Sequence, residues 1–501
     1  MKKLTTSILL SIVALLISGC DANLPEDEED IIPELISSEE YKTFWNPSTT
    51  LEFDISMSPN AAAFMNDHQS NKDDSYYFDY YVPCTLNYSI NGIEETMEEV
   101  GIRVKGNWSR NPFLFEGQFD PTSKAHFKLS FGETFDGDEY DTIDDLKEFK
   151  KVWSDEAERD IRKDRTLFDM EKVDMKWNRN DDQTKVKQSY MLKTFRDNGV
   201  IAGHTTLADT TLMVEDGYVL EDTYEILEVV DSVLMKRYFD EEHADGDLYK
   251  CTYQNAPANF ASYYTVGNQI GIEDNVNGYH PAYDLKTNKK KSSSHTNLLN
   301  LFAAINDKTS TAEDFKENIE TFIDMDSFLM YEAIAFLCGN FDDFRNNANN
   351  YYVYISSIDN MAYFIPYDFD RGLGAGAMDH QNYMTDFSAE STKMQISGNS
   401  AWQTCNLFWR TICQSTDSAS GHKNVARVET YRKQYQTNIE KLLNDEIVSS
   451  DSFTSYVNSF PSSYRGNPDG AGLDNISFDD YLQLKINAVK SYDTTYNITV
   501  S

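Results

Sequence analysis

The chain has 501 residues, of which 40% are hydrophobic and 13% aromatic, so it encodes an ordered globular protein of two or more parts and not a disordered tail. It carries 83 Asp and Glu residues against 44 Lys and Arg residues, and its formal net charge of −39 disfavours nucleic acid as a partner and favours cationic partners or divalent metals. The absence of G-x-x-x-x-G-K-[S/T] and H-E-x-x-H motifs argues against a P-loop enzyme and a zincin protease.

The N-terminal residues 1–19 have the pattern of a bacterial export signal. Two lysines precede an apolar stretch at residues 8–17, and the L-I-S-G-C sequence that ends at Cys20 resembles a lipobox. In this interpretation Cys20 becomes the lipidated first residue, and the acidic residues 20–44 form a tether. The sequence thus predicts a lipoprotein anchored to a membrane outside the cytoplasm, on the periplasmic face or the cell surface. A plain secretory signal or an uncleaved anchor is the alternative.

Two strands with one apolar and one basic face are predicted at residues 99–105 and 124–131. The basic faces carry Arg103 and Lys105 on the first strand and Lys128 on the second. Basic side chains on neighbouring strands can neutralise the phosphates of a nucleotide, as a strand lysine does in protein kinases. The alternative is pairing with the surplus carboxylates on a solvated face, and for Lys128 the two interpretations are equally supported.

The next part of the chain changes in character twice. Residues 136–185 are charged and poorly periodic, so we expect a long excursion with short helical pieces. The strands predicted at 205–214 and 218–228 flank an acidic turn with glycine at its end, which indicates a β-hairpin.

Most of the predicted helices lie toward the C-terminus. Apolar periodicity, caps and terminal glycines identify them. The expected helices cover residues 187–198, 231–239, 296–305, 311–322 and 327–338, parts of 395–446, and a terminal helix near 481–492. The helix at 327–338 stops at Gly339, so the loop that follows hangs from a buried helix end.

That loop, rich in Asp and Asn, leads into a predicted hairpin of strands at Tyr351–Ile355 and 361–366. A hairpin brings its two ends together, so Asp342 before the first strand and Asp368 after the second are expected to meet. With Asn350 they form the set that phosphoryl transfer requires, in which one carboxylate orients the nucleophile and an Asn and a second Asp hold a divalent metal. An ordinary acidic turn after a buried strand is the alternative.

Some roles in this loop have more than one candidate. Asp370 is a second candidate metal ligand. Asp343 adjoins Asp342 and could share or replace its role. Asn347 competes with Asn350, because the catalytic loops of protein kinases place an Asn five residues beyond the Asp.

Five cysteines remain after Cys20, and none has the spacing of a metal-binding motif. Export makes disulfides possible, and Cys405 with Cys413 is the nearest pair in sequence. The odd number leaves at least one thiol free or paired between chains. Cys338 lies in a predicted apolar helix and is expected to be a small buried residue rather than a nucleophile.

Several ordered motifs resemble those of the spore-coat protein H (CotH) kinases, a family of atypical protein kinases. The motifs are N-F-D at 340–342, N-Y-Y at 350–352, P-Y-D-F-D at 366–370 with Gly374, G-I-R-V-K-G-N-W-S at 101–109, K-A-H-F-K-L-S-F at 124–131 and Y-D-L-K-T-N at 283–288. The resemblance spans roughly residues 45 to 380, and such a series of ordered motifs is more specific than any one of them.

The resemblance implies an α+β, atypical protein-kinase-like fold of two lobes. Residues 45–240 would form a strand-rich N-terminal lobe with an insertion. Residues 241–501 would form a mostly helical C-terminal lobe that holds the catalytic loop and the metal-binding hairpin. The implied activity is phosphorylation of Ser or Thr on a protein substrate, with ATP and Mg²⁺ as cofactors, Mn²⁺ as a substitute and Ca²⁺ as a further possibility.

The resemblance also implies roles for individual residues. Asp342 would be the catalytic residue, Asn350, Asp368 and Asp370 the metal ligands, and Arg103, Lys105, Lys128 and Glu228 the ATP- and phosphate-binding residues. Glu228 stands where the family has a Glu after a strand, and it is a candidate partner for Lys105. An ordinary glutamate at a strand end is the equally supported alternative.

Two other classes of function compete with a kinase. ATP is scarce outside the cytoplasm, so the fold could serve a surface binding or adhesion lipoprotein that transfers nothing and binds Ca²⁺. A metal-dependent phosphohydrolase could also use the D-x-D pair, with the basic strands holding an anionic substrate. The intact set of Asp342, Asn350 and Asp368 argues against a silent site.

Overall fold

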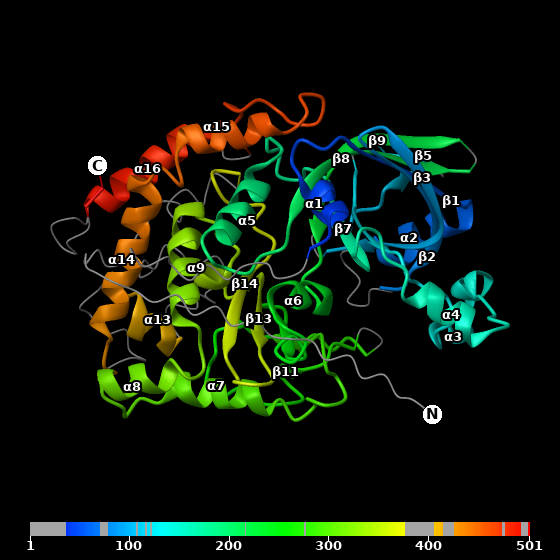
Figure 1. The fold of residues 1–501 in the computed structure, drawn as a ribbon. Coiled ribbons are helices and arrows are strands. Elements are labelled where there is room, and N and C mark those ends of the chain that lie inside the picture. The colour runs from blue at the N-terminus through cyan, green and yellow to red at the C-terminus, as the bar shows by residue number, and fades with distance from the viewer. Residues whose placement is uncertain are drawn as a thin grey trace, which may run out of the picture.

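The computed structural model describes residues 37–70, 79–106, 109–115, 118–120, 123–215, 217–274, 277–375, 405–413, 425–472, 476–491 and 499–500. Strands dominate its N-terminal part and helices its C-terminal part (Figure 1), so the prediction of an α+β protein in this order is confirmed. The export signal, Cys20 and the first part of the tether lie outside the described residues. So do Asn107 and Trp108 of the family motif.

The N-terminal part is built on a closed seven-stranded barrel, which the sequence did not predict. In spatial order its strands are β1 (Leu51–Met57), β2 (Val82–Ile90), β3 (Ile93–Lys105), β6 (His126–Ser130), β7 (Lys172–Lys176), β9 (Tyr218–Glu228) and β8 (Thr205–Val214). Strand β1 closes the barrel by pairing parallel to β8, whereas all other neighbours are antiparallel. The predicted β8–β9 hairpin is confirmed by the pairing of Val214 with Tyr218.

Apolar side chains on alternate positions of these strands fill the barrel, as the period of two requires. The buried set includes Phe53, Ile55, Val100, Ile102, Val104, Phe127, Leu129, Val173 and Met175. The intervening positions of β3, β6 and β7 point out of the barrel, and most of their charged side chains are basic: Arg103, Lys105, Lys128, Lys172 and Lys176, with Asp174 among them. The barrel therefore presents a basic face formed by strands that neighbour one another.

The predicted excursion at 136–185 is only partly correct. It does contain short helices, α3 (Glu139–Thr142), the 3₁₀ helix η1 (Asp144–Phe149) and α4 (Glu156–Lys163), and α3 and α4 project from the barrel (Figure 1). Its last part, however, is β7, a strand of the barrel that lies between β6 and β9. Three of the five β7 residues are charged, so the strand has little of the apolar content that marks a buried strand in a sequence.

Three further short elements accompany the barrel: α2 (Pro59–Gln69) and a ribbon of β4 (Leu114–Phe115) with β5 (Gln118–Phe119). In addition, helix α1 (Glu39–Trp45) forms where the tether was expected to continue to residue 44. Tyr41, Phe44 and Trp45 are buried, so this end of the tether is part of the folded body.

The C-terminal part combines a five-stranded sheet with helices. The sheet order is β11 (Ile270–Gly271), β12 (Tyr283–Leu285), β10 (Asp247–Cys251), β13 (Tyr351–Ile355) and β14 (Ala362–Pro366). The helices are α5 (Lys187–Asp197), α6 (Ser232–Tyr238), α7 (Thr296–Asn306), α8 (Ala312–Ile319), α9 (Met325–Cys338), α10 (Phe344–Asn347), α13 (Asn406–Thr411), α14 (Glu429–Asn444), α15 (Ser450–Ser459) and α16 (Phe478–Ser491). The sequence predicted most of these helices and the β13–β14 hairpin.

Helix α9 is the centre of this part. It is buried almost all round, and α14, α5 and β14 pack against it (Figure 1). It ends at Gly339 in the left-handed conformation (φ +61°), where a Cβ atom would lie 2.1 Å from the Tyr481 hydroxyl. Only glycine fits there, so the loop that follows α9 leaves the helix at a fixed place.

The cysteines are packing residues rather than cross-links. Cys84, Cys251, Cys338 and Cys405 are buried free thiols, and Cys413 is also buried. Because Cys405 is free, it does not pair with Cys413. Within the residues that the structure describes, no helix combines the length and the apolar character needed to cross a membrane.

A buried cluster around Glu228 fastens α1 to the barrel. The Tyr41 hydroxyl donates to the Glu228 carboxylate at 2.8 Å, and Arg237 Nε donates to it at 3.1 Å. The Arg237 guanidinium lies 3.6 Å from the centre of the Tyr41 ring. His204 Nδ1 is 3.0 Å from Glu228 Oε2.

We expect this cluster to make folding sensitive to acid through His204. Burial lowers the pKa of His204 to about 4 from its ordinary value of 6.5. Between these pH values the unfolded chain binds the proton and the folded protein does not, so stability falls as the pH is lowered from 6.5 to 4. At pH 4 this histidine lowers the free energy of unfolding by up to about 3 kcal/mol, and replacing it removes that pH-dependent loss.

The measurement is the melting temperature of wild type and His204→Gln at several pH values between 7 and 4. The variant should be less stable at pH 7, and the gap should narrow as the pH falls. His243→Gln is the control, because Asp240 raises the pKa of that histidine and the gap should not narrow. A His204→Gln gap that stays constant would contradict the prediction.

Candidate active site

A polar cleft lies between the outer face of the barrel and the β13–β14 hairpin, and it encloses about 250 Å³. Nine basic side chains line it: Arg103, Lys105, Arg110, Lys128, Lys176, Arg179, Lys250, Lys286 and Arg371. Five acidic side chains line it as well: Asp79, Glu273, Asp342, Asp368 and Asp370. The cleft is therefore locally basic in a chain whose net charge is −39.

Asp342 is held at the edge of this cleft by amide groups of its own loop. Its backbone N–H donates to Asn340 Oδ1 at 3.1 Å. Its carboxylate accepts from the side-chain amides of Asn347 at 2.8 Å, Asn349 at 3.0 Å and Asn350 at 3.1 Å. The Asn-rich sequence thus supplies neutral donors that orient one carboxylate.

The surroundings of Asp342 suit a proton acceptor. Burial raises its pKa, and the nearby Asp368 charge adds to the rise, while the hydrogen bonds from Asn347 and Asn349 oppose it. A carboxylate with a raised pKa and a fixed orientation takes up a proton more readily than an exposed one.

The structure separates the residues that competed for roles in this loop. Asp342 and Asn350 line the cleft, whereas Asn347 lies in α10 and does not line it. Asp343 is fully buried, and its Oδ1 caps α10 by accepting from Asn346 N at 2.9 Å. Of the two neighbouring aspartates, only Asp342 lines the cleft.

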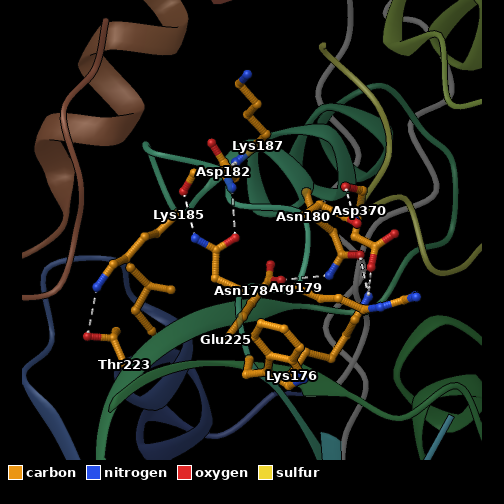
Figure 2. A pocket seen from close by; sticks show the side chains of 13 residues that line it. Lys176, Asn178, Arg179, Asn180, Asp182, Lys185, Lys187, Thr223, Glu225 and Asp370 are labelled. Atoms are coloured by element: carbon orange, nitrogen blue, oxygen red, sulfur yellow. Dashed lines mark hydrogen bonds and ion pairs between the residues drawn. The ribbon is translucent and has the colours of Figure 1, made fainter. Parts of the chain in front are cut away.

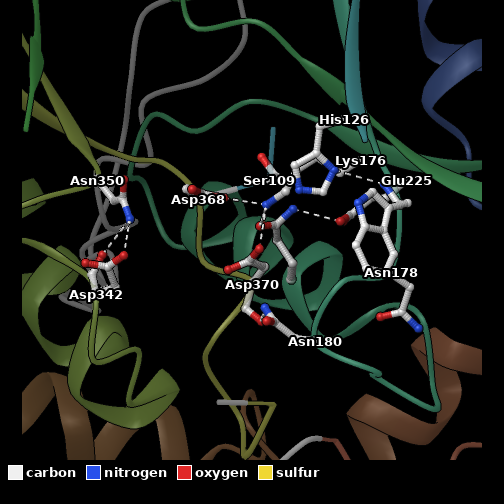
Figure 3. Close-up of polar contacts among 12 residues, drawn as sticks. Ser109, His126, Lys176, Asn178, Asn180, Glu225, Asp342, Asn350, Asp368 and Asp370 are labelled. Carbon is white, nitrogen blue, oxygen red and sulfur yellow. Dashed lines mark hydrogen bonds and ion pairs between the residues drawn. The ribbon is translucent and has the colours of Figure 1, made fainter. Parts of the chain in front are cut away.

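On the other side of the cleft, Asp368 and Asp370 converge on the ammonium of Lys176, while Asp342 with Asn350 faces them across the gap (Figure 3). Lys176 Nζ donates to Asp368 Oδ1 and lies 3.0 Å from Asp370 Oδ2. Burial alone would raise the pKa of Asp368, but Lys176 holds it below its ordinary range. Asp368 also has a positive φ of 58°, a conformation that costs energy and clusters at functional sites.

The expected meeting of the two hairpin ends is seen in these contacts. Asn340 Nδ2 reaches the Asp368 carbonyl oxygen at 3.3 Å, which links the loop before β13 to the turn after β14. Asn350, like Asp368, has a positive φ, 53°. The polar residues before β13 and those after β14 are therefore brought to the same end of the hairpin, as the order of the sequence predicts.

The basic face of the barrel carries the residues predicted to contact phosphates. Lys105 Nζ donates to Asp174 Oδ2 at 2.6 Å and to the Tyr367 hydroxyl at 3.1 Å. Lys128 lies directly across the sheet from Arg103, and its Nζ is 3.2 Å from Asp174 Oδ1. Asp174 is thus the shared counter-ion of both lysines.

Glu228 does not belong to this site, and its predicted pairing with Lys105 is wrong. It pairs with Val173 across the β7–β9 ladder, and Val173 points into the barrel. Because side chains alternate along a strand, Asp174 points to the outer face, where Lys105 lies. Glu228 instead holds α1, and Asp174 takes the place predicted for it.

Sequence reasoning missed Asp174 and Lys176, both on β7. One signal was available: Val173 and Met175 alternate with Lys172, Asp174 and Lys176, which is the pattern of a strand with one apolar face. The surrounding acidic, aperiodic sequence hid it.

The acidic residues of the cleft fit a divalent cation. Among the described residues, no group of three or more His, Cys, Asp or Glu side chains is arranged to hold a metal. Asp368 and Asp370 nevertheless both contact one cationic group, the Lys176 ammonium. Their oxygens are therefore close enough together to bind one positive ion jointly. Mg²⁺ is bound in proteins by one or two carboxylates together with substrate phosphates, and this pair supplies such carboxylates.

Asp343 belongs to a buried network in which two carboxyl groups share one guanidinium. Burial raises the pKa of Asp343 to about 7 and that of Glu332 to about 8. The Arg345 guanidinium lies 3.5 Å from Glu332, and its positive charge opposes the rise of the Asp343 pKa. Because the Asp343 pKa lies above its ordinary 3.8, the folded state loses stability from this group as the pH rises from 3.8 to 7.

We therefore expect Asp343→Asn to raise the melting temperature, and to do so more at pH 8 than at pH 5. The amide oxygen keeps the α10 cap, and the variant removes a buried charge whose burial costs about 1 kcal/mol or more. Asp343→Ala is the contrast, because it loses the cap and should be destabilising at both pH values. Asp343→Asn that destabilises most at pH 8 would contradict this account.

The comparisons with known proteins agree with the motifs. The family described as CotH kinase protein matches residues 102–466, which is more than half of the chain and reaches from β3 through the loop that carries Asp342 to the segment after α15. Among curated proteins, no sequence matches the chain. On the family match, this protein belongs to the CotH kinase protein family.

Proposed function

We propose that this protein is an ATP- and divalent-metal-dependent protein kinase of the atypical, two-lobed type, which phosphorylates Ser or Thr on a protein outside the cytoplasm. The observation that carries the proposal is the reversed charge of the cleft. Nine basic side chains gather around five acidic ones in a chain of net charge −39. A local excess of positive charge next to a carboxylate pair is what binding a metal–triphosphate requires.

The surroundings of each acidic or amide side chain in the cleft support a different role for it. Asp342, with its raised pKa, would orient the substrate hydroxyl and take its proton. Asp368 and Asn350 would hold the metal, with Asp370 as a further ligand, and the bound cation would neutralise charge on the phosphates. The side-chain nitrogen of Asn350 is used on Asp342, so its oxygen is the atom left for a cation.

The phosphate groups would be held by the basic face of the barrel. Arg103, Lys105 and Lys128 lie together on the outer face of β3 and β6 and line the cleft. Lys176 from β7 lines the cleft beside them. Asp174 keeps Lys105 and Lys128 in place without neutralising the cleft, since one carboxylate serves two ammonium groups.

The decisive experiment is transfer of label from γ-labelled ATP to protein, with Mg²⁺ or Mn²⁺. We expect label in the protein itself or in an added acceptor, and a loss of about 100-fold or more for Asp342→Asn and for Asp368→Asn. Asp451→Asn, an exposed aspartate in the first turn of α15, is the control and should keep full activity.

The same assay separates the competing classes. Release of phosphate without labelled protein would mean a phosphohydrolase. Neither label nor calorimetric binding of ATP in the presence of metal would mean a binding protein and would end the kinase proposal. Loss of label in Asp451→Asn as well would show that the losses reflect folding rather than chemistry.

We also propose that the chain is a lipoprotein attached to a membrane through Cys20. The support is the export signal and the L-I-S-G-C sequence. The first helix of the fold, α1, begins at Glu39, 19 residues beyond that cysteine. The folded body would therefore be held close to the membrane surface.

This localisation predicts that cells fed labelled palmitate incorporate label into the protein and that Cys20→Ser abolishes it. The variant should leave the membrane fraction for the soluble fraction, because one or two acyl chains supply the anchor. Cys84→Ser is the control, because Cys84 is buried in the barrel and should not affect labelling. Unchanged labelling in Cys20→Ser would exclude this anchor.

A further inference from the structure

Lys176 occupies the position between the two carboxylates to which the proposed function assigns the metal. Its side chain is only 6% exposed, and its ammonium contacts both Asp368 and Asp370. An ammonium and a divalent cation cannot share this position, because like charges at such distances repel strongly in a buried site. In this arrangement a lysine contacts both of the carboxylates that the proposed function assigns to the metal.

A second carboxyl group, that of Glu225, lies next to the same lysine. Glu225 is the direct partner of Lys176 across the β7–β9 ladder, so the two side chains point to the same side of the sheet. Both line the small polar cavity that adjoins the cleft (Figure 2). Among the described residues, Glu225 Oε1 is a buried oxygen without a hydrogen-bond partner.

Gln188 connects the two positions. Its amide oxygen accepts from Lys176 Nζ at 3.1 Å, and its amide nitrogen donates to Glu225 Oε2 at 2.7 Å. The ammonium of Lys176 thus already touches a group bonded to Glu225. A lysine side chain has four rotatable bonds along its stem, so it can change partner without movement of β7.

We propose that Lys176 is a built-in competitor of the divalent cation: it occupies Asp368 and Asp370 in the metal-free protein and transfers to Glu225 when the metal binds. This rests on the proposed function, because it takes Asp368 and Asp370 as metal ligands. A buried ammonium that left one carboxylate pair for no other partner would be strongly destabilising. Burial raises the pKa of Glu225 to about 8, so Glu225 removes that cost by releasing its proton to water as the ammonium arrives, and its unused oxygen is explained as the receiving atom.

The device has two consequences. It prevents repulsion between the neighbouring Asp368 and Asp370 carboxylates when no metal is present, and it sets the metal affinity lower than the carboxylates alone would give. The affinity is then a balance between the two partners of Lys176. Removing the lysine and removing its second partner must change that balance in opposite directions.

The test is the affinity of the purified full-length protein for Mn²⁺ without nucleotide, measured from the electron paramagnetic resonance signal of free Mn²⁺. We expect Lys176→Met to bind Mn²⁺ about tenfold more tightly and Glu225→Gln to bind it several-fold more weakly. In the double variant the effect of Glu225→Gln should vanish, since no lysine is left to receive.

Lys185→Met is the matched control. Lys185 lines the same cavity but donates to Thr223 and contacts neither metal ligand, so its loss should change the affinity by about twofold at most. Melting temperatures of all variants establish that they are folded, and the opposite signs of the two single variants cannot both come from unfolding.

Each outcome decides something. Mn²⁺ that binds wild type and Lys176→Met equally, or the variant more weakly, overturns the competitor role and leaves the proposed kinase intact. A Glu225→Gln effect that persists without Lys176 overturns the transfer. No Mn²⁺ binding by wild type or by Lys176→Met overturns the metal site, and the proposed function falls with it.

Discussion

The burial of basic side chains on the outer face of the barrel is the constraint on which the rest of the structure depends. An ion taken out of water costs several kcal/mol unless it is paired. Lys105 meets this constraint with Asp174 on a neighbouring strand. Lys176 meets it with Asp368, which lies 192 residues further along the chain, after the β13–β14 hairpin. The ion pairs of Lys176 therefore position the candidate metal ligands and link the barrel to the C-terminal part.

The two key carboxylates are driven toward different states by their neighbours. Asp342 is surrounded by neutral amides, so burial dominates and its pKa is raised. Asp368 faces ammonium groups, so its pKa is lowered despite burial. Two carboxylates whose environments separate their pKa values in this way are suited to separate tasks, one to hold a proton and one to hold a cation. The loop sequence achieves this by placing asparagines, not lysines, around Asp342.

The sequence predicted features that depend on neighbouring residues and missed features that depend on contacts between segments far apart in the chain. The β13–β14 hairpin and the approach of Asp342 to Asp368 were predictable, because turn and strand patterns are local and the family motifs lie on them. Barrel closure by β1 and β8 joins segments far apart in the chain and has no local signal. Strand β7 was missed because a lysine is normally expected on the surface. Lys176 is buried only because Asp368 and Asp370, from a distant part of the chain, pair with it. Glu228 was misplaced because its face of the sheet depends on the register with β7, which no local pattern fixes.

The acidity of the whole chain makes the basic cleft a requirement rather than a detail. A body of net charge −39 repels a nucleotide from a distance, so attraction must come from charges close to the site. Screening helps, because exposed charges more than about 8 Å apart interact weakly at physiological salt. In the cleft itself nine basic side chains outnumber five acidic ones, and two of the acidic side chains share the single charge of Lys176. In the proposed function, a divalent cation bound at those two carboxylates would add two positive charges to the cleft, so the attraction for phosphate would rise at the step where phosphate must bind.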